Sequence, residues 1–245
     1  MLRMKLLGGA QFMQDDAPLT GFISAKAQAL LCYLAVTRRA QRRDTLCGLL
    51  WAEKPDADAK LSLRVALSNL HRLLASNLII NRETVTFNVH SEYWLDVEVF
   101  EAPIPGLAGT MSPRAVEQLR EKERLYCGEF LAGFFVRDAP GFEEWALGPR
   151  ARYRRLALEA IYLLAAQYSA QHEYTLAIDY TARLLEMEPW QEEAHLRMMQ
   201  LLNDIGQHGA ALAQYETCRL MLATEFNLAP SEAMRLLAAR IRAAR

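Results

Sequence analysis

A stretch rich in proline and glycine, from Val97 to Pro113, is the feature that most constrains how this chain folds. Its three prolines and two glycines interrupt all helical periodicity, because proline lacks a backbone donor and glycine favours turns. Before this stretch, short strand patterns alternate with helical ones, and after it the pattern is helical. We therefore expect a hinge and two domains, residues 1–97 and 98–245. A chain of 245 residues with 52% hydrophobic content can fill two cores.

The distribution of charge differs between these two parts. The net charge is −1 and 23% of residues are charged, which excludes a disordered acidic tail or a wholly basic nucleic-acid coat. Residues 1–97 hold 4 Lys and 8 Arg against 9 Asp or Glu, so the first domain is the basic one. No apolar run approaches the ~20 residues that a membrane span needs, and the N-terminus is too short for a signal peptide. The sequence predicts a cytoplasmic protein with no membrane partner.

Five apolar runs in the first domain have the length and composition of strands. Residues 3–7 and 10–13 flank a glycine pair that suits a tight turn, and residues 18–23 are candidates to extend this sheet. Residues 78–80 and 85–89 predict a hairpin, because the second run alternates apolar and polar residues. The expected inward-facing side chains of that run are Val85, Phe87 and Val89.

Three helices are expected between these groups of strands. Ser24 is the expected N-cap of the first, which runs to about Thr37. Asp44 is the expected cap of a short second helix that ends before Pro55, and the third begins near Asp58. Strands, three short helices and a terminal hairpin are the order of a winged helix, an α+β fold whose third helix enters the DNA major groove.

The third helix has a leucine face and a polar face. At 100° per residue the leucines gather on one side: Leu63, Leu67, Leu70 and Leu74. The opposite side or its flanks carry Lys60, Arg64, Val65, Ser68, Asn69 and Arg72. Arginine pairs with guanine, asparagine with adenine, serine bonds phosphate or a base edge, and valine contacts a thymine methyl group. A merely solvated helix face would show the same pattern. His71 lies close to the leucines and is expected to be a partly buried spacer.

Three segments carry a resemblance to a known family, namely KAQALLCYLA, RRDTLCGLLW and LRVALSNLHRLL. They resemble the OmpR-type DNA-binding domain of the antibiotic-regulatory-protein (SARP) family of bacterial activators. The resemblance implies that the third helix reads DNA with Lys60, Arg64, Val65, Ser68, Asn69 and Arg72. It also implies backbone or wing contacts from Arg42, Arg43, Asn81, Arg82 and Thr84. The basic run 38–43 suits phosphate contact and equally suits a solvated turn.

Spacings of 34 residues recur in the second domain. Glu159-Ala160 is repeated at Glu193-Ala194, and Ala177 at Ala211. This is the period of tetratricopeptide (TPR) repeats, in which helical hairpins stack their apolar faces. Pro189 closes the first unit, and the second unit overruns before a last helix capped by Ser231. We expect a short, irregular, all-helical TPR-like array, so that the chain as a whole is mainly α.

The second domain also carries a resemblance, in LYCGEFLAGF, FEEWA, EPWQEEAHLRMMQLL and ALAQYETCRLMLATEFNLAPS. These segments resemble the bacterial transcriptional activator domain that follows the winged helix in the same family. The resemblance implies an activator that binds repeats in double-stranded promoter DNA and contacts RNA polymerase or its sigma factor. The TPR-like domain would then serve regulation or homodimerisation. The alternative is a TPR-type adaptor that binds proteins and whose winged helix does not read DNA.

Catalytic, metal and cofactor sites are not expected. The sequence lacks the GxSxG, GxxxxGK[ST] and HExxH motifs. The histidines are scattered, and the cysteines lack metal-ligand spacing, so all four cysteines are expected to be buried apolar residues. Eight aromatic residues of the second domain are expected in the core rather than in a ligand groove: Phe130, Phe134, Phe142, Trp145, Tyr153, Tyr162, Trp190 and Tyr215.

Overall fold

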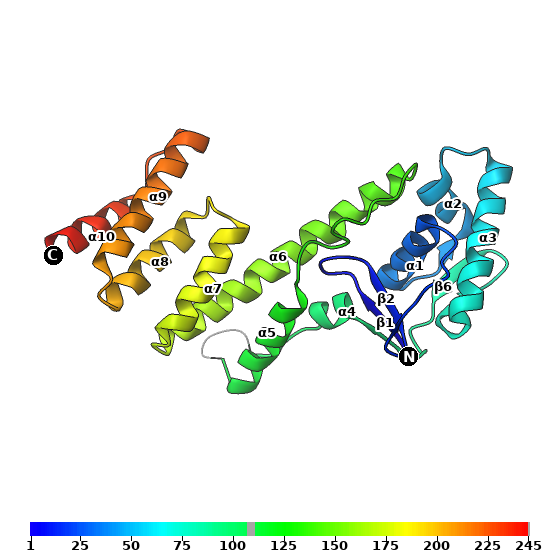
Figure 1. The fold of residues 1–245 in the computed structure, drawn as a ribbon, viewed down its shortest axis with the longest axis horizontal. Helices are drawn as coiled ribbons and strands as arrows, with labels where there is room; N and C mark the ends of the chain where they lie inside the picture. Colours follow the sequence, from blue (N-terminus) through cyan, green and yellow to red (C-terminus); the bar gives the residue numbers. More distant parts are fainter. Residues whose placement is uncertain (107–110, 245) are drawn as a thin grey trace. The chain divides into compact units, whose positions relative to one another are not determined.

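The computed structural model describes residues 1–106 and 111–244 (Figure 1). A mixed α/β region with small sheets is followed by an all-helical region, which confirms the expected fold class. The chain forms two compact units, unit 1 (residues 1–103 and 124–155) and unit 2 (residues 104–123 and 156–245). Segment 124–155 thus packs with the N-terminal residues, whereas the sequence suggested a division at residue 97. Part of the expected hinge, residues 107–110, lies outside the described residues.

Unit 1 contains a four-stranded sheet in the order β3-β2-β1-β7. Its strands are β1 (Leu2–Lys5), β2 (Gln11–Gln14), β3 (Ala17–Pro18) and β7 (Tyr93–Leu95). The first two lie where the glycine pair predicted them, whereas the third ends at Pro18 instead of continuing to residue 23. The sequence did not reveal β7, because this strand has only three residues and its parallel partner β1 is far from it in the sequence.

The three helices of the winged helix follow the expected order. They are α1 (Ala25–Thr37), α2 (Arg43–Trp51) and α3 (Asp56–Leu74). The Ser24 hydroxyl accepts a hydrogen bond from the backbone N–H of Ala27, which confirms the predicted N-cap of α1. The prediction for Asp44 was wrong. This residue lies inside the first turn of α2, whose N-cap is Arg42.

The wing is a second sheet in the order β4-β6-β5. A short helix, η1 (Ala75–Asn77), leads from α3 to β5 (Leu78–Ile80), and the hairpin partner is β6 (Thr84–Phe87). Strand β4 (Gln41–Arg42) pairs with β6 and so joins the basic run before α2 to the wing. Val85 and Phe87 are buried as expected. Val89 is exposed, because β6 has ended before it.

Unit 1 is completed by α4 (Asp96–Glu101) and by segment 124–155, which includes the start of α6 (Pro140–Ala170). The buried Asp96 carboxylate accepts backbone hydrogen bonds from Leu6, Leu7 and Val97, at 2.6, 2.8 and 2.7 Å. Leu7 also forms a β-bridge with Phe130, a fully buried residue of segment 124–155.

Unit 2 is helical and repetitive. Its helices are α5 (Pro113–Leu125), the C-terminal part of α6, α7 (Tyr174–Met187), α8 (Glu192–Asp204), α9 (His208–Phe226) and α10 (Glu232–Ala243). Helices α7 and α9 begin 34 residues apart, which agrees with the TPR period. The small residues Ala177 and Ala211 are fully buried in them, and the Ser231 side chain caps α10 as predicted.

Of the eight aromatic residues expected in the core, Phe130, Phe142, Tyr153 and Tyr215 are buried, and Phe134, Trp145 and Tyr162 are half-buried. Cys32, Cys47 and Cys218 are buried, and burial raises the pKa of the Cys218 thiol to about 11. The expectation of burial was wrong for Cys127 and Trp190, because both are exposed. Within the described residues no group of His, Cys, Asp and Glu could hold a metal ion, and no helix is long and apolar enough to cross a bilayer.

Candidate nucleic-acid interface

Helix α3 presents the two faces that the sequence predicted, with one exception. The four leucines of the leucine face, Leu63, Leu67, Leu70 and Leu74, are all buried. The exposed side chains of the predicted set are Lys60, Arg64, Val65, Ser68 and Arg72. Arg64, Val65 and Ser68 lie in the middle of α3, on the side opposite the buried leucines.

The exception is Asn69, which is only 7% exposed. Its side-chain oxygen accepts a hydrogen bond from the backbone N–H of Ile23 at 3.1 Å, and its side-chain nitrogen donates to the carbonyl of Gly21 at 2.9 Å. Both polar ends of the amide are therefore engaged inside the protein. The expectation that Asn69 faces outward was wrong, and we assign it a positioning role that ties the segment before α1 to α3.

We expect Asn69→Ala to lower the free energy of unfolding by about 2 kcal/mol, because it leaves two partly buried backbone groups without partners. Chemical denaturation measures this loss. The matched control is Ser68→Ala, which changes an exposed neighbour on the same helix and should leave the unfolding midpoint in place. Equal midpoints for the two variants would contradict the positioning role.

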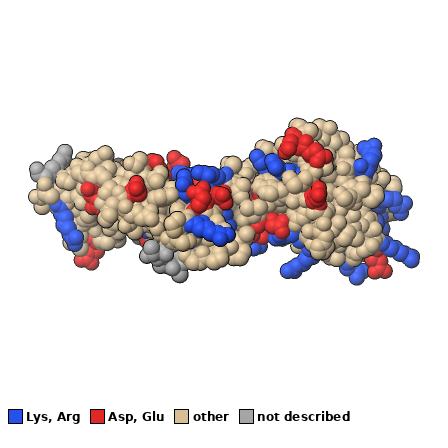
Figure 2. All heavy atoms as spheres, turned by 90° about the horizontal axis from the view of Figure 1, so that it is seen from below, with Lys and Arg blue, Asp and Glu red and all other residues tan. Residues whose placement is uncertain are grey.

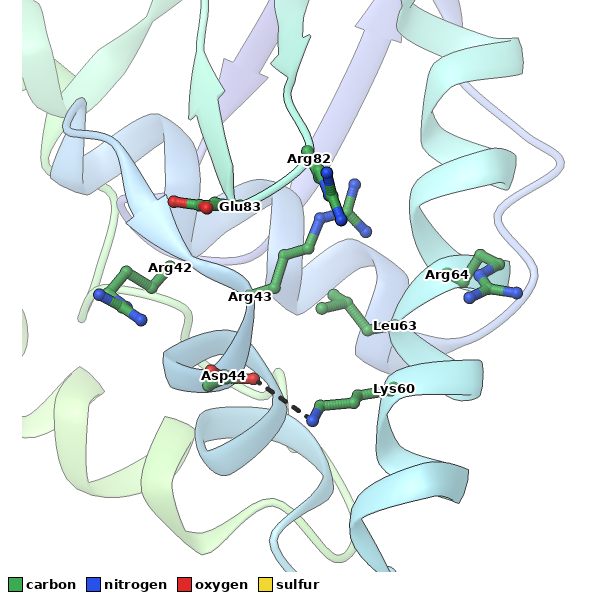
Figure 3. A pocket seen from close by; sticks show the side chains of 8 residues that line it. All are labelled: Arg42, Arg43, Asp44, Lys60, Leu63, Arg64, Arg82 and Glu83. Carbon is green, nitrogen blue, oxygen red and sulfur yellow. Dashed lines mark ion pairs between the residues drawn. The ribbon is translucent and has the colours of Figure 1, made fainter.

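A pocket of about 390 Å³ lies between α3, the start of α2 and the wing (Figure 3). We call it the basic pocket, and it is lined by Arg42, Arg43, Asp44, Lys60, Leu63, Arg64, Arg82 and Glu83. The lining therefore contains five cationic residues and two acidic ones. The pocket unites residues that the sequence assigned separately to the recognition helix and to the wing, and its excess of positive charge favours an anion.

Two cations of the basic pocket are held by protein groups. Arg43 donates from Nε and Nη2 to the carbonyl of Asn81, at 3.2 and 2.9 Å, and so fixes the turn of the wing to α2. Lys60 donates to Asp56 at 2.7 Å and lies 3.8 Å from Asp44. The hydrogen bond to Asp56 raises the pKa of Lys60. These contacts leave Arg42, Arg64 and Arg82 as the pocket cations most available to a ligand.

The remaining wing residues shape its tip. The backbone N–H of Asn81 donates to the carbonyl of Thr84 at 2.9 Å and closes the turn that exposes Asn81 and Arg82. Thr84 is half-buried and pairs in register with Arg42. The turn therefore carries Arg82 at its tip and the strand pairing holds Arg42 beside it.

Two exposed residues of α3 were missed by sequence reasoning. His71 is exposed rather than partly buried, and it lines a second pocket with Arg43, Arg64 and Ser68. Leu61 is also exposed, one turn before Val65. A helical wheel could have found Leu61, but leucine is normally assigned to the buried face. Figure 2 shows Lys and Arg side chains projecting from the end of unit 1 where α2 and α3 lie in Figure 1.

A winged helix with a polar recognition face, followed by a TPR-like array, defines a class of two-part transcriptional regulators. The chain belongs to the family of the bacterial transcriptional activator domain (BTAD), whose model matches residues 95–242. This membership agrees with the resemblance to SARP-type bacterial transcriptional regulators. The match begins close to the boundary expected from the sequence, although the compact units divide the chain differently.

A solved structure supports the fold over the whole chain. Mycobacterium tuberculosis EmbR, in complex with a low-affinity phosphopeptide, matches with a TM-score of 0.75 and 22% sequence identity. The match covers 100% of this chain and 65% of the EmbR chain. A search of curated proteins finds no match. The chain therefore shares the fold of EmbR over about two thirds of that protein's length.

Proposed function

We propose that this chain is a sequence-specific activator that binds repeats in double-stranded promoter DNA through α3 and the wing. It contacts RNA polymerase or its sigma factor, and unit 2 serves regulation or homodimerisation. The cytoplasm is the compartment of such a protein. The observation that carries the proposal is the exposed face of α3, which presents Arg64, Ser68 and Arg72. Arg64 also lines the basic pocket together with Arg42 and Arg82.

Charge and geometry divide this surface into two tasks. Arg42 and Arg82 come from β4 and the wing, where a duplex held against α3 presents its phosphates, and phosphate contacts supply affinity without sequence information. Arg64, Ser68 and Arg72 extend from the helix itself, where base edges are read. Because Asp44 and Glu83 also line the pocket, its surface is not uniformly basic.

Replacing Arg72 by alanine should weaken binding to the specific site on the order of tenfold, because a bidentate pair with guanine is lost. Binding to random DNA should change much less. Mobility shifts with the specific and a shuffled duplex measure both affinities. The matched control is Arg235→Ala, which removes an exposed arginine from α10 and should leave both affinities unchanged.

Equal losses on both duplexes would refute the assignment of Arg72 to base reading. If the full chain binds no duplex at low salt but captures a protein partner, the adaptor function replaces the proposed one.

A further inference from the structure

We infer that Leu61 and Val65 read thymine methyl groups, so that the binding site contains thymines opposite the N-terminal half of α3. This inference rests on the proposed function and specifies the chemistry of the DNA that the same surface recognises. It adds Leu61 to the residues proposed above to contact base edges, and it assigns Leu61 and Val65 together to apolar contacts.

The two side chains form an exposed apolar pair. Leu61 is 56% exposed and Val65 44% exposed. They are four residues apart on one helix and are therefore neighbours on its surface. They line a pocket together with Ile23, which is 58% exposed, and the same pocket is lined by two basic and two acidic residues: Lys26, Lys54, Glu53 and Asp138. We call Leu61, Val65 and Ile23 the apolar patch. Single exposed apolar residues are common, whereas contiguous ones are candidates for a binding surface.

The structure holds this patch in a fixed position. Asn69 bonds the backbone of Gly21 and Ile23 to α3, so Ile23 is held beside the helix. Gly21 has φ +89°, a conformation that favours glycine, and a Cβ there would lie 3.5 Å from the side chain of Leu73. The positive φ of Gly21 and the two hydrogen bonds of Asn69 thus hold this segment beside α3.

The charges beside the patch indicate DNA as its occupant. On the helical wheel Leu61 and Val65 share the outward face of α3 with Arg64, Ser68 and Arg72, all exposed. A partner that covers this face must offer negative charge and small apolar groups side by side. The major groove does so, because phosphates line its edges and the thymine methyl group is the apolar feature of its floor.

Replacing single thymines by deoxyuridine tests this inference, because it removes one methyl group and preserves base pairing. A duplex selected by the full-length protein from a random pool is resynthesised with one deoxyuridine at each thymine in turn. We expect one or two positions at which the native protein loses about three- to fourfold in affinity, the value of one buried methyl group. In Leu61→Ala/Val65→Ala the loss at those positions should disappear.

The matched control is Leu147→Ala/Val99→Ala, which truncates a leucine 59% exposed and a valine 40% exposed elsewhere in unit 1. It should retain the deoxyuridine effect of the native protein. Thermal unfolding of both double variants checks that each is folded.

Four outcomes would overturn the inference. A selected site that is insensitive to deoxyuridine throughout, or an effect that persists in Leu61→Ala/Val65→Ala, excludes methyl reading while leaving the proposed function intact. Loss of transcriptional activation by that variant, with DNA affinity and the deoxyuridine effect unchanged, makes the patch a protein-docking surface. If the native protein selects no sequence at all, the proposed function itself fails.

Discussion

A fragment that ends at residue 103 is expected to fail to fold, although it contains every strand and helix of the winged helix. Segment 124–155 buries Phe130, Phe142 and Tyr153 in unit 1. The rings of Tyr33 and Trp145 meet edge-on at 4.9 Å, and those of Phe100 and Tyr126 stack at 5.9 Å. Each large apolar side chain that loses its burial costs about 1.5–3 kcal/mol.

Three such losses cost about 5–9 kcal/mol, which is comparable with the 5–15 kcal/mol that typically stabilises a domain. Backbone hydrogen bonds from Leu131 to Leu6 and from Gly8 to Glu129 are lost as well. A fragment of residues 1–155 keeps all of these contacts and should unfold cooperatively. Circular dichroism during heating compares the two fragments. A cooperative transition in residues 1–103 at the temperature found for residues 1–155 would show that segment 124–155 is dispensable.

Replacing Arg42 and Arg82 together by alanine should weaken DNA binding about a hundredfold at low salt, whatever the DNA sequence. Both side chains are exposed in the basic pocket, and each charge-assisted hydrogen bond contributes about 1.5–3 kcal/mol. The slope of log affinity against log salt should become shallower by about 2, since each phosphate contact contributes roughly 0.9. Arg43 is left in place because it holds the wing turn.

Arg235→Ala/Arg240→Ala is the matched control, because it removes the same charge from exposed positions on α10. Affinities are measured by fluorescence anisotropy at several salt concentrations. If the control and the pocket variant have the same slope, the wing cations act only through net charge, and the assignment of the basic pocket to phosphate binding is wrong.

Local patterns predicted much of this fold. The leucine stripe of α3 follows the 3.6-residue period, so its buried face could be found without tertiary information. The Ser24 cap depends on a residue three positions away, and the glycine pair forms the turn that directly connects β1 and β2. The TPR period is visible because Ala177 and Ala211 occupy equivalent crowded positions. These features share a short range along the chain or a regular spacing.

What the sequence could not reveal depends on distant partners. Asn69 was assigned to base reading because its type and helical position fit, but its partners lie 46 and 48 residues earlier. Segment 124–155 joins unit 1 through Leu7 and Phe130, and no local pattern encodes that pairing. Leu61 was overlooked because a leucine on an amphipathic helix is normally buried, and only the packing around α3 exposes it.

The most direct test of DNA reading by α3 is a titration of the full-length protein with a selected duplex and its shuffled counterpart, at 50 and 200 mM salt. The account predicts an affinity for the selected duplex at least about a thousandfold higher, with both affinities falling as salt rises. Equal affinities for the two duplexes at both salt concentrations would contradict it.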